Sequence, residues 1–379
     1  MKVIGIVVFM LIFLYSIIFD NFLFVQSYDT NQFMEHYPTP NTKHNRVMGL
    51  VLAFNHYHID PLFLIFNEYV SMCEAGWDPT VVLFTTVTWS ERLLRYLRQK
   101  TYCYRISKSI EIRTSQFDPS INIALGAQHR PYIAKEIDNY DVFIYHEDDM
   151  VFKLSHLSGY LHETKQLHKL LPENGLTDHC IGFQRYRRIQ NGNDIRIAHT
   201  DTDIIELEFL EELPNFVPTC IKDQPYLRVD GNIHQAIWMF TRQQLLFLQE
   251  KCSFFNQSSP SREYMSSFSV FDHKAGHCGL TKLLPAERLV TFAILHYFQQ
   301  RHVSWTPLFN SDENIRAGYH YMSAMDSRSP AGMPDCWKEI VERARKEQAN
   351  STATTDIKHI NHHHRNFTIV HEDNKEESN

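Results

Sequence analysis

The sequence lacks several features that mark common classes of protein. Its seven cysteines are widely spaced and form no Cys-x-x-Cys pair, so neither a zinc ribbon nor a thioredoxin-type redox site is expected. It also lacks an excess of basic residues. The formal net charge is −7, whereas a protein that binds nucleic acid presents a basic surface to the phosphates. We therefore expect no nucleic-acid partner.

The amino-terminal segment has no charged residue from Val3 to Phe19, and no Ala-x-Ala cleavage pattern follows it. A helix of this length spans about 25 Å at ~1.5 Å per residue, near the lower limit for crossing a bilayer. A cleaved signal peptide has a shorter apolar region and a small-residue cleavage site. We predict an uncleaved signal anchor at residues 1–25, a type II orientation with Lys2 in the cytoplasm, and a lumenal body.

The remaining chain divides by composition. Residues 26–45 are polar, contain two prolines and predict a stem, and residues 46–346 predict the globular body. Residues 347–379 are polar and charged, which is typical of a disordered tail. In an oxidising lumen some cysteines would pair, and an odd number leaves at least one thiol free in a monomer.

Strand and helix patterns alternate through residues 46–150, which predicts a parallel sheet with helices on both faces. The expected strands are residues 47–54, 80–85, 110–113 and 140–146. The expected helices begin at Asp60–Pro61, at Ser90 and at about Pro119, the last running to Ile137.

The pattern becomes irregular in residues 151–346. We expect helices at residues 154–171 and 285–300, a strand at residues 180–186, and short mixed or antiparallel pieces within residues 190–230. Residues 233–247 predict a strand followed by a helix that Thr241 caps.

Glu147, Asp148 and Asp149 directly follow the fourth expected strand. Adjacent carboxylates repel one another and are costly to desolvate, so a cation or a strong hydrogen-bond network is expected beside them. Magnesium and manganese take oxygen ligands, and ligands of α/β folds bind at the carboxyl ends of strands. The triplet therefore predicts a site for a divalent metal and a diphosphate. The alternative is a solvated acidic turn that caps the helix beginning near Lys153.

The anchor, the stem, the strand–helix alternation and the run Phe143-Ile144-Tyr145-His146-Glu147-Asp148-Asp149-Met150 together resemble membrane-anchored glycosyltransferases of the GT-A fold. Glu147 stands at the first acidic position of their Asp-x-Asp-type motif. The resemblance covers residues 1–150 well and the rest loosely. It implies an α/β fold with a GT-A-like, Rossmann-type and mostly parallel sheet flanked by helices, a mixed second half and one preceding transmembrane helix.

The resemblance also implies a function. A lumenal enzyme of the Golgi or endoplasmic reticulum would move a sugar from a nucleotide-sugar donor to a glycan or glycoprotein acceptor. Residues 46–150 would bind the donor, and residues 151–346 would bind the acceptor. Asp149, with Glu147 directly or through water, would hold Mn²⁺ or Mg²⁺, and Asp148 would contact ribose or sugar hydroxyls.

Further site residues follow from their places after the expected strands and helices. The donor-binding candidates are Asn55, His56, Thr85, His129, Arg130 and Asp148, with Tyr57 or Trp89 stacking on the base and Arg185 or Arg187 contacting phosphate. The acceptor-binding candidates are His234 and Trp238.

An inverting transferase also needs a base that deprotonates the acceptor hydroxyl. The candidates are Glu263, Asp272 and Asp230, and Glu263 is preferred because it stands just before a loop rich in cysteine and glycine. A late histidine often supplies a further metal ligand in this fold group. His277, His296 and His302 are available for it, although the apolar neighbours of His296 favour a core histidine.

Two other functions remain open. The run His56-Tyr57-His58-Ile59-Asp60 resembles the start of the metal site in metallo-β-lactamase-fold hydrolases, although Pro61 stands where that pattern continues with histidine. The first alternative is thus a metal-dependent hydrolase that uses His56, His58 and Asp60. The second is a non-catalytic sugar-binding protein on the same fold.

Overall fold

The computed structural model describes residues 45–54, 58–171, 178–189, 204–207, 215–230, 235–256, 268–273, 277–286, 292–296, 334–340 and 342. Its helices and strands all belong to the compact unit Arg46–Asn379. The predicted anchor, the tail and almost all of the predicted stem lie outside these residues. Within the described part of the chain, no helix is both long and apolar enough to span a bilayer.

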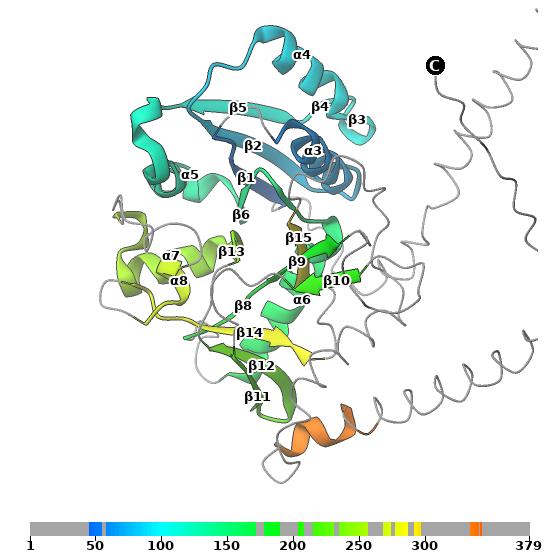
Figure 1. The fold of residues 1–379 in the computed structure, drawn as a ribbon, viewed down its shortest axis with the longest axis vertical. Helices are drawn as coiled ribbons and strands as arrows, with labels where there is room; N and C mark the ends of the chain where they lie inside the picture. The colour runs from blue at the N-terminus through cyan, green and yellow to red at the C-terminus, as the bar shows by residue number, and fades with distance from the viewer. Residues whose placement is uncertain are drawn as a thin grey trace, which may run out of the picture. The chain divides into compact units, whose positions relative to one another are not determined.

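A five-stranded sheet has the order β13-β6-β1-β2-β5, with four strands from the first half of the body and β13 from the second (Figure 1). Its strands are β1 (Arg46–Leu52), β2 (Asp78–Thr85), β5 (Glu111–Gln116), β6 (Val142–Glu147) and β13 (Ile237–Thr241). The first four are parallel to one another, and β13 pairs antiparallel with β6. The predicted, mostly parallel α/β sheet is confirmed.

Helices cover both faces of this sheet because its strands carry apolar residues at successive positions. Val47 and Val51 of β1 pack in one core cluster with α3 (Ile59–Glu74) and α4 (Glu91–Lys100). Met48 and Leu50 point to the opposite face, where they pack in a second cluster with α5 (His129–Glu136) and α7 (Arg242–Cys252). Ser90 caps α4 as predicted, its Oγ accepting a hydrogen bond from the Leu93 amide at 3.2 Å.

The helix predicted from about Pro119 to Ile137 is broken. A 3₁₀ segment, Pro119–Ala127, precedes α5, and it contains a non-helical residue, Asn122, at φ 46°. Its ψ of −130° is far from the helical value, so the chain cannot continue as a helix through this residue. Pro131 also lacks the amide hydrogen that a continuous helix would use at that position.

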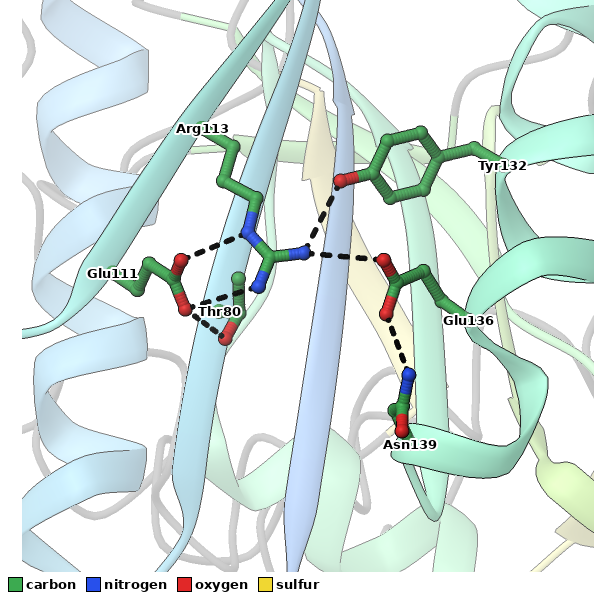
Figure 2. A network of polar contacts seen from close by, with 6 residues as sticks. All are labelled: Thr80, Glu111, Arg113, Tyr132, Glu136 and Asn139. Atoms are coloured by element: carbon green, nitrogen blue, oxygen red, sulfur yellow. Dashed lines mark hydrogen bonds and ion pairs between the residues drawn. The ribbon is translucent and has the colours of Figure 1, made fainter.

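A polar network joins the edge strand β5 to α5, the helix that precedes β6 (Figure 2). The Arg113 guanidinium donates hydrogen bonds to the Glu111 carboxylate at 2.9 and 3.2 Å and to the Tyr132 hydroxyl at 3.3 Å. It also reaches Glu136 at 3.4 Å, and Asn139 donates to the other oxygen of that carboxylate at 3.0 Å. The network anchors the sheet edge to the segment leading into the acidic triplet.

The second half of the body contains two mixed four-stranded sheets, ordered β10-β9-β15-β7 and β11-β12-β14-β8. The strands of the first are β7 (Met150–Val151), β9 (Gln184–Ile189), β10 (Ile204–Leu207) and β15 (Ala293–His296). Those of the second are β8 (His179–Ile181), β11 (Asn215–Ile221), β12 (Gln224–Asp230) and β14 (Thr281–Pro285). The body also contains a short β3–β4 ladder (Tyr102–Cys103 and Lys108–Ser109), α6 (Leu154–Leu170) and α8 (Phe268–Phe271).

Two predictions in this half are wrong. Residues 180–186 were expected as one strand but divide at Gly182–Phe183 between β8 and β9, which belong to different sheets. Residues 285–300 were expected as a helix, yet Ala293–His296 is the strand β15. Its pairing with β9 and β7 supplies long-range hydrogen bonds that local periodicity does not encode. The predicted helix 154–171 and the Thr241 cap of α7 are confirmed.

Three disulfides join Cys73 to Cys103, Cys220 to Cys336 and Cys252 to Cys278. The seventh cysteine, Cys180, is free and buried. The odd count therefore leaves one thiol unpaired, as expected from the sequence.

Candidate metal and donor site

The acidic triplet lies at the carboxyl end of β6, with Asp148 and Asp149 only 7% and 8% exposed. Its backbone is held by both neighbouring strands. The Asp148 amide donates to the Leu52 carbonyl of β1 at 3.1 Å, and the Glu147 amide donates to the Ala236 carbonyl beside β13 at 3.2 Å. Helix α6 begins after Lys153 as its N-cap, so the solvated capping turn is ruled out.

This position is the switch point of the sheet. The parallel strands run β5-β2-β1-β6, so the third, second, first and fourth strands in chain order lie side by side. The order reverses between β1 and β6, and α/β proteins bind ligands at the carboxyl ends of strands at such a point.

His58, which follows β1, lies against the triplet. Its Nδ1 is 2.8 Å from Asp148 Oδ1. Burial raises the pKa of Asp148 to about 6, the His58 hydrogen bond and charge oppose that rise, and the Asp149 charge adds to it. Helix α3 begins slightly earlier than the Asp60–Pro61 start expected from the sequence, with His58 as its N-cap residue and Asp60 in its first turn.

The buried rings of His146 and Tyr69 hold the backbone of the triplet through hydrogen bonds. His146 Nδ1 lies 3.0 Å from the Glu147 carbonyl, and its Nε2 lies 3.0 Å from the Tyr69 hydroxyl. Because a carbonyl only accepts, Nδ1 carries the hydrogen, and the Tyr69 hydroxyl donates to Nε2. Burial lowers the pKa of His146 to about 4, which keeps the ring neutral near neutral pH, and the two hydrogen bonds fix this tautomer.

The backbone beside Glu147 adopts an unfavourable conformation. Ala236 has φ 51° and is completely buried, and its carbonyl is the acceptor for the Glu147 amide. A residue with a β-carbon in this region costs roughly 1 kcal/mol or more, and such positions gather at ligand sites.

No family model matches this chain, and no curated protein matches it.

The site offers oxygen ligands for a hard divalent cation. Asp148 and Asp149 contribute buried carboxylates, and Glu147 adjoins them with a partly exposed one. Among the described residues, no group of three or more histidines, cysteines or carboxylates is placed to hold a metal ion. Magnesium sites of this class commonly use one or two carboxylates, with substrate phosphates and water completing the shell. The two carboxylates thus fit a metal that binds together with a diphosphate.

Thr85 lies at the carboxyl end of β2 but is buried, and its hydroxyl accepts hydrogen bonds from Trp89 Nε1 at 3.1 Å and from the Val87 amide at 3.3 Å. Trp89, the residue expected to stack on a base, packs in the core cluster of α3 and α4. Both side chains shape the strand end, and their contact with a donor stays a prediction.

His129 and Arg130 begin α5 and are buried away from solvent. The His129 ring packs against Tyr145 and Trp238 at centroid distances of 4.3 and 5.4 Å, and burial lowers its pKa well below the ordinary value. Arg130 donates to the Ser269 hydroxyl and covers the Phe254 ring at 4.7 Å.

Trp238, predicted to stack on an acceptor sugar, is 1% exposed and stacks on Tyr145 at 5.6 Å. These residues form one aromatic layer under the sheet, so little of their surface faces a ligand in this conformation.

Asp272 follows α8 and is partly exposed, and its Oδ2 lies 3.3 Å from His277 Nδ1. The pair brings together a predicted base and a predicted late histidine. Asn55, His56, His234 and Glu263 lie outside the described residues. Asp230 pairs with Arg228 at 2.9 Å on β12, and His296 lies on β15 opposite Met150.

The contact between His58 and Asp148, and the support from Tyr69 and His146, were not predicted from the sequence. The contact between His58 and Asp148 could have been predicted, because β1 and β6 are neighbours in a Rossmann-type half and the residues that follow both strands meet at one edge. Gly49 indicated that a large side chain packs against β1 where Tyr69 lies. A β-carbon there would lie 2.1 Å from the Tyr69 hydroxyl oxygen, so β1 leaves room for that ring only through glycine.

Proposed function

We propose that this protein is a metal-dependent glycosyltransferase of the GT-A type that transfers a sugar from a nucleotide-sugar donor to a glycan or glycoprotein acceptor. The observation that carries the proposal is the pair of buried carboxylates, Asp148 and Asp149, at the switch point of a parallel sheet. An unsolvated carboxylate pair is costly by itself, and a divalent cation with a diphosphate offsets that cost.

Asp149 would hold Mn²⁺ or Mg²⁺, with Glu147 directly or through water. Because Asp148 is buried beside Asp149, we assign it to the metal as well, in place of the sugar contact expected from the sequence. When bound, the ion would stabilise negative charge that develops on the departing nucleoside diphosphate. His58 orients the Asp148 carboxylate through the 2.8 Å contact, as outer partners of metal ligands commonly do. The His146 and Tyr69 pair fixes the backbone on which the triplet stands.

The acceptor hydroxyl must lose a proton as it attacks the sugar. Two of the candidate bases lie among the described residues. Asp230 is paired with Arg228, whereas Asp272 lies 3.3 Å from the imidazole of His277, which would orient its carboxylate, so Asp272 is preferred. The three disulfides support the lumenal location proposed for the body, because disulfides persist in oxidising compartments such as the Golgi and endoplasmic reticulum.

The proposal is tested by screening nucleotide-sugars for Mn²⁺-dependent release of the nucleotide by the full-length chain. We expect one donor to be turned over with metal and not in chelator. Asp149→Asn should lower that turnover at least about 100-fold, the size of effect seen when transition-state charge loses a stabilising group. Asp78→Asn, an exposed carboxyl on β2, is the matched control and should retain it.

The two alternatives predict different outcomes. A hydrolase that binds zinc through His56 and His58 would lose its activity in His56→Ala while its nucleotide-sugar affinity stayed unchanged. A non-catalytic sugar-binding protein would bind sugar in chelator and release no nucleotide. Either result, or an Asp149→Asn enzyme with full activity, contradicts the transferase proposal.

A further inference from the structure

Two cationic side chains are buried together in the second half of the body. Lys282 of β14 is 1% exposed and Arg185 of β9 is 3% exposed. Among the described residues, neither Lys282 Nζ nor Arg185 Nε has a hydrogen-bond partner, and no carboxylate forms an ion pair with either side chain.

The groups around Lys282 do not neutralise it. Its stem crosses Gly182, where an added β-carbon would lie 2.6 Å from Lys282 Cγ, and its Nζ lies 6.0 Å from the Phe271 ring centroid. Gln235 adjoins the same stem, but its Oε1 already accepts the Phe183 amide at 2.9 Å. Burial and the Arg185 charge lower the pKa of Lys282 to about 7.

Burying two cations without a counter-charge is unfavourable by several kcal/mol for each ion unless an opposite charge accompanies them. Lysine and arginine together supply up to eight N–H donors and favour oxyanions such as phosphate and carboxylate groups. We propose that Lys282 and Arg185 form an oxyanion-binding site.

This site adjoins the acidic triplet. Gln235, which touches the Gly182–Lys282 crossing, directly precedes Ala236, whose carbonyl accepts the Glu147 amide. Arg185 pairs with Ile294 of β15, and β15 pairs in turn with β7, the strand that follows the triplet. A cation pair and a carboxylate pair therefore lie on either side of one short stretch of chain.

The identity of the oxyanion rests on the proposed function. It is either the diphosphate of the donor or an acidic group on the acceptor, and both present the same oxygen chemistry to the two cations. The existence of the site does not depend on a metal, so it can be tested with the triplet disabled.

The test measures the thermal unfolding midpoint of the full-length chain in excess chelator, with inorganic pyrophosphate and, separately, glucuronate as probes, at ionic strength matched with sodium chloride. We expect one probe or both to raise the midpoint of the wild type and of Asp149→Asn. Lys282→Met and Arg185→Met should weaken that binding at least about tenfold, since a hydrogen bond to a charged group is worth about 1.5–3 kcal/mol. Arg242→Met, which removes a surface cation, is the control.

The probes separate the two sources. Stabilisation by pyrophosphate alone assigns the site to the donor diphosphate, and stabilisation by glucuronate alone assigns it to an acidic acceptor. Stabilisation by both supports an oxyanion site that accepts either group. Lys282→Arg keeps the charge and should retain binding. If Lys282→Met does not fold, the expected weakening is measured with Arg185→Met alone. A wild-type midpoint that neither probe moves, or equal shifts in wild type and in the Lys282 and Arg185 variants, overturns the inference. If the wild type binds a probe in chelator but shows no metal-dependent turnover of any nucleotide-sugar, the transferase proposal fails and the oxyanion site stands.

Discussion

Burial and hydrogen bonding shift the pKa of the Asp148 carboxyl group in opposite directions. Burial raises its pKa to about 6, and the His58 contact only partly offsets this. A carboxyl whose pKa is higher in the folded state favours folding while protonated, and that contribution is lost as pH rises through about 6. The folded chain therefore carries an unfavourable charge at neutral pH, which a bound cation would relieve.

Asp148→Asn removes this titration. In chelator, the free energy of unfolding of the wild type should fall between pH 4 and pH 6.5, and this fall should be up to about 3 kcal/mol larger than in the variant. The figure follows because the pKa of Asp148 rises from 3.8 to about 6, and each pKa unit corresponds to ~1.4 kcal/mol. Urea unfolding at several pH values measures the difference. Parallel pH profiles for the two proteins would show that Asp148 is not held in this environment.

Gly49→Ala tests the support beneath the triplet. Its new β-carbon would lie 2.1 Å from the Tyr69 hydroxyl oxygen, so the ring must move from His146. Overpacking of this kind should lower the free energy of unfolding by about 1–3 kcal/mol. Tyr69→Phe removes the hydroxyl without a clash, and it should cost about 1–3 kcal/mol because His146 Nε2 loses its buried partner. A Gly49→Ala protein as stable as the wild type would mean that the ring is not confined there.

Among elements, β5 depends on polar contacts more than the inner strands do, since its side chains are mostly half-buried or exposed. Arg113→Met should lower the free energy of unfolding by about 1 kcal/mol, because it removes bonds to two carboxylates and a hydroxyl in one network. Arg98→Met removes an exposed pair with Glu91 at 4.0 Å and should cost less than about 0.5 kcal/mol. Equal effects in the two variants would show that the network of Figure 2 adds nothing beyond a surface pair.

Local patterns predicted the elements of the first half better than those of the second. Strands β1, β2 and β6 have continuous apolar runs and helix α4 has a clear cap, so their residues alone define them. Strand β15 was mistaken for a helix because its apolar residues are stabilised by two partners distant in the chain. The division at Gly182 was missed for a similar reason, since the lysine that requires a glycine there lies on another strand.

The candidate site was predicted only in part, because local sequence shows which residues follow a strand but not how distant elements pack. Acidic residues after a strand are visible in the sequence, and the fold brings His58 to them as the topology of neighbouring strands requires. The burial of Trp238 and Arg130 depends on how α5 and β13 pack, which no local pattern specifies.

At the scale of the whole molecule, the disulfides join segments that are far apart in the chain, with Cys220 and Cys336 separated by 116 residues. Burial raises the pKa of the remaining thiol, Cys180, to about 12, so it should be unreactive in the folded chain. We expect iodoacetamide to label no thiol in the native protein and one per chain in denaturant without reductant. Cys180→Ala should give none, and two or more labelled thiols in denaturant would contradict the pairing described here.

The most direct test of the central claim is calorimetric titration of the full-length chain with Mn²⁺, with and without a saturating nucleoside diphosphate. We predict one binding site that tightens when the diphosphate is present, weakens as pH falls through about 6, and disappears in Asp149→Asn. Mn²⁺ binding of the same strength in wild type and Asp149→Asn would contradict the account, because the buried carboxylates would then not hold the ion.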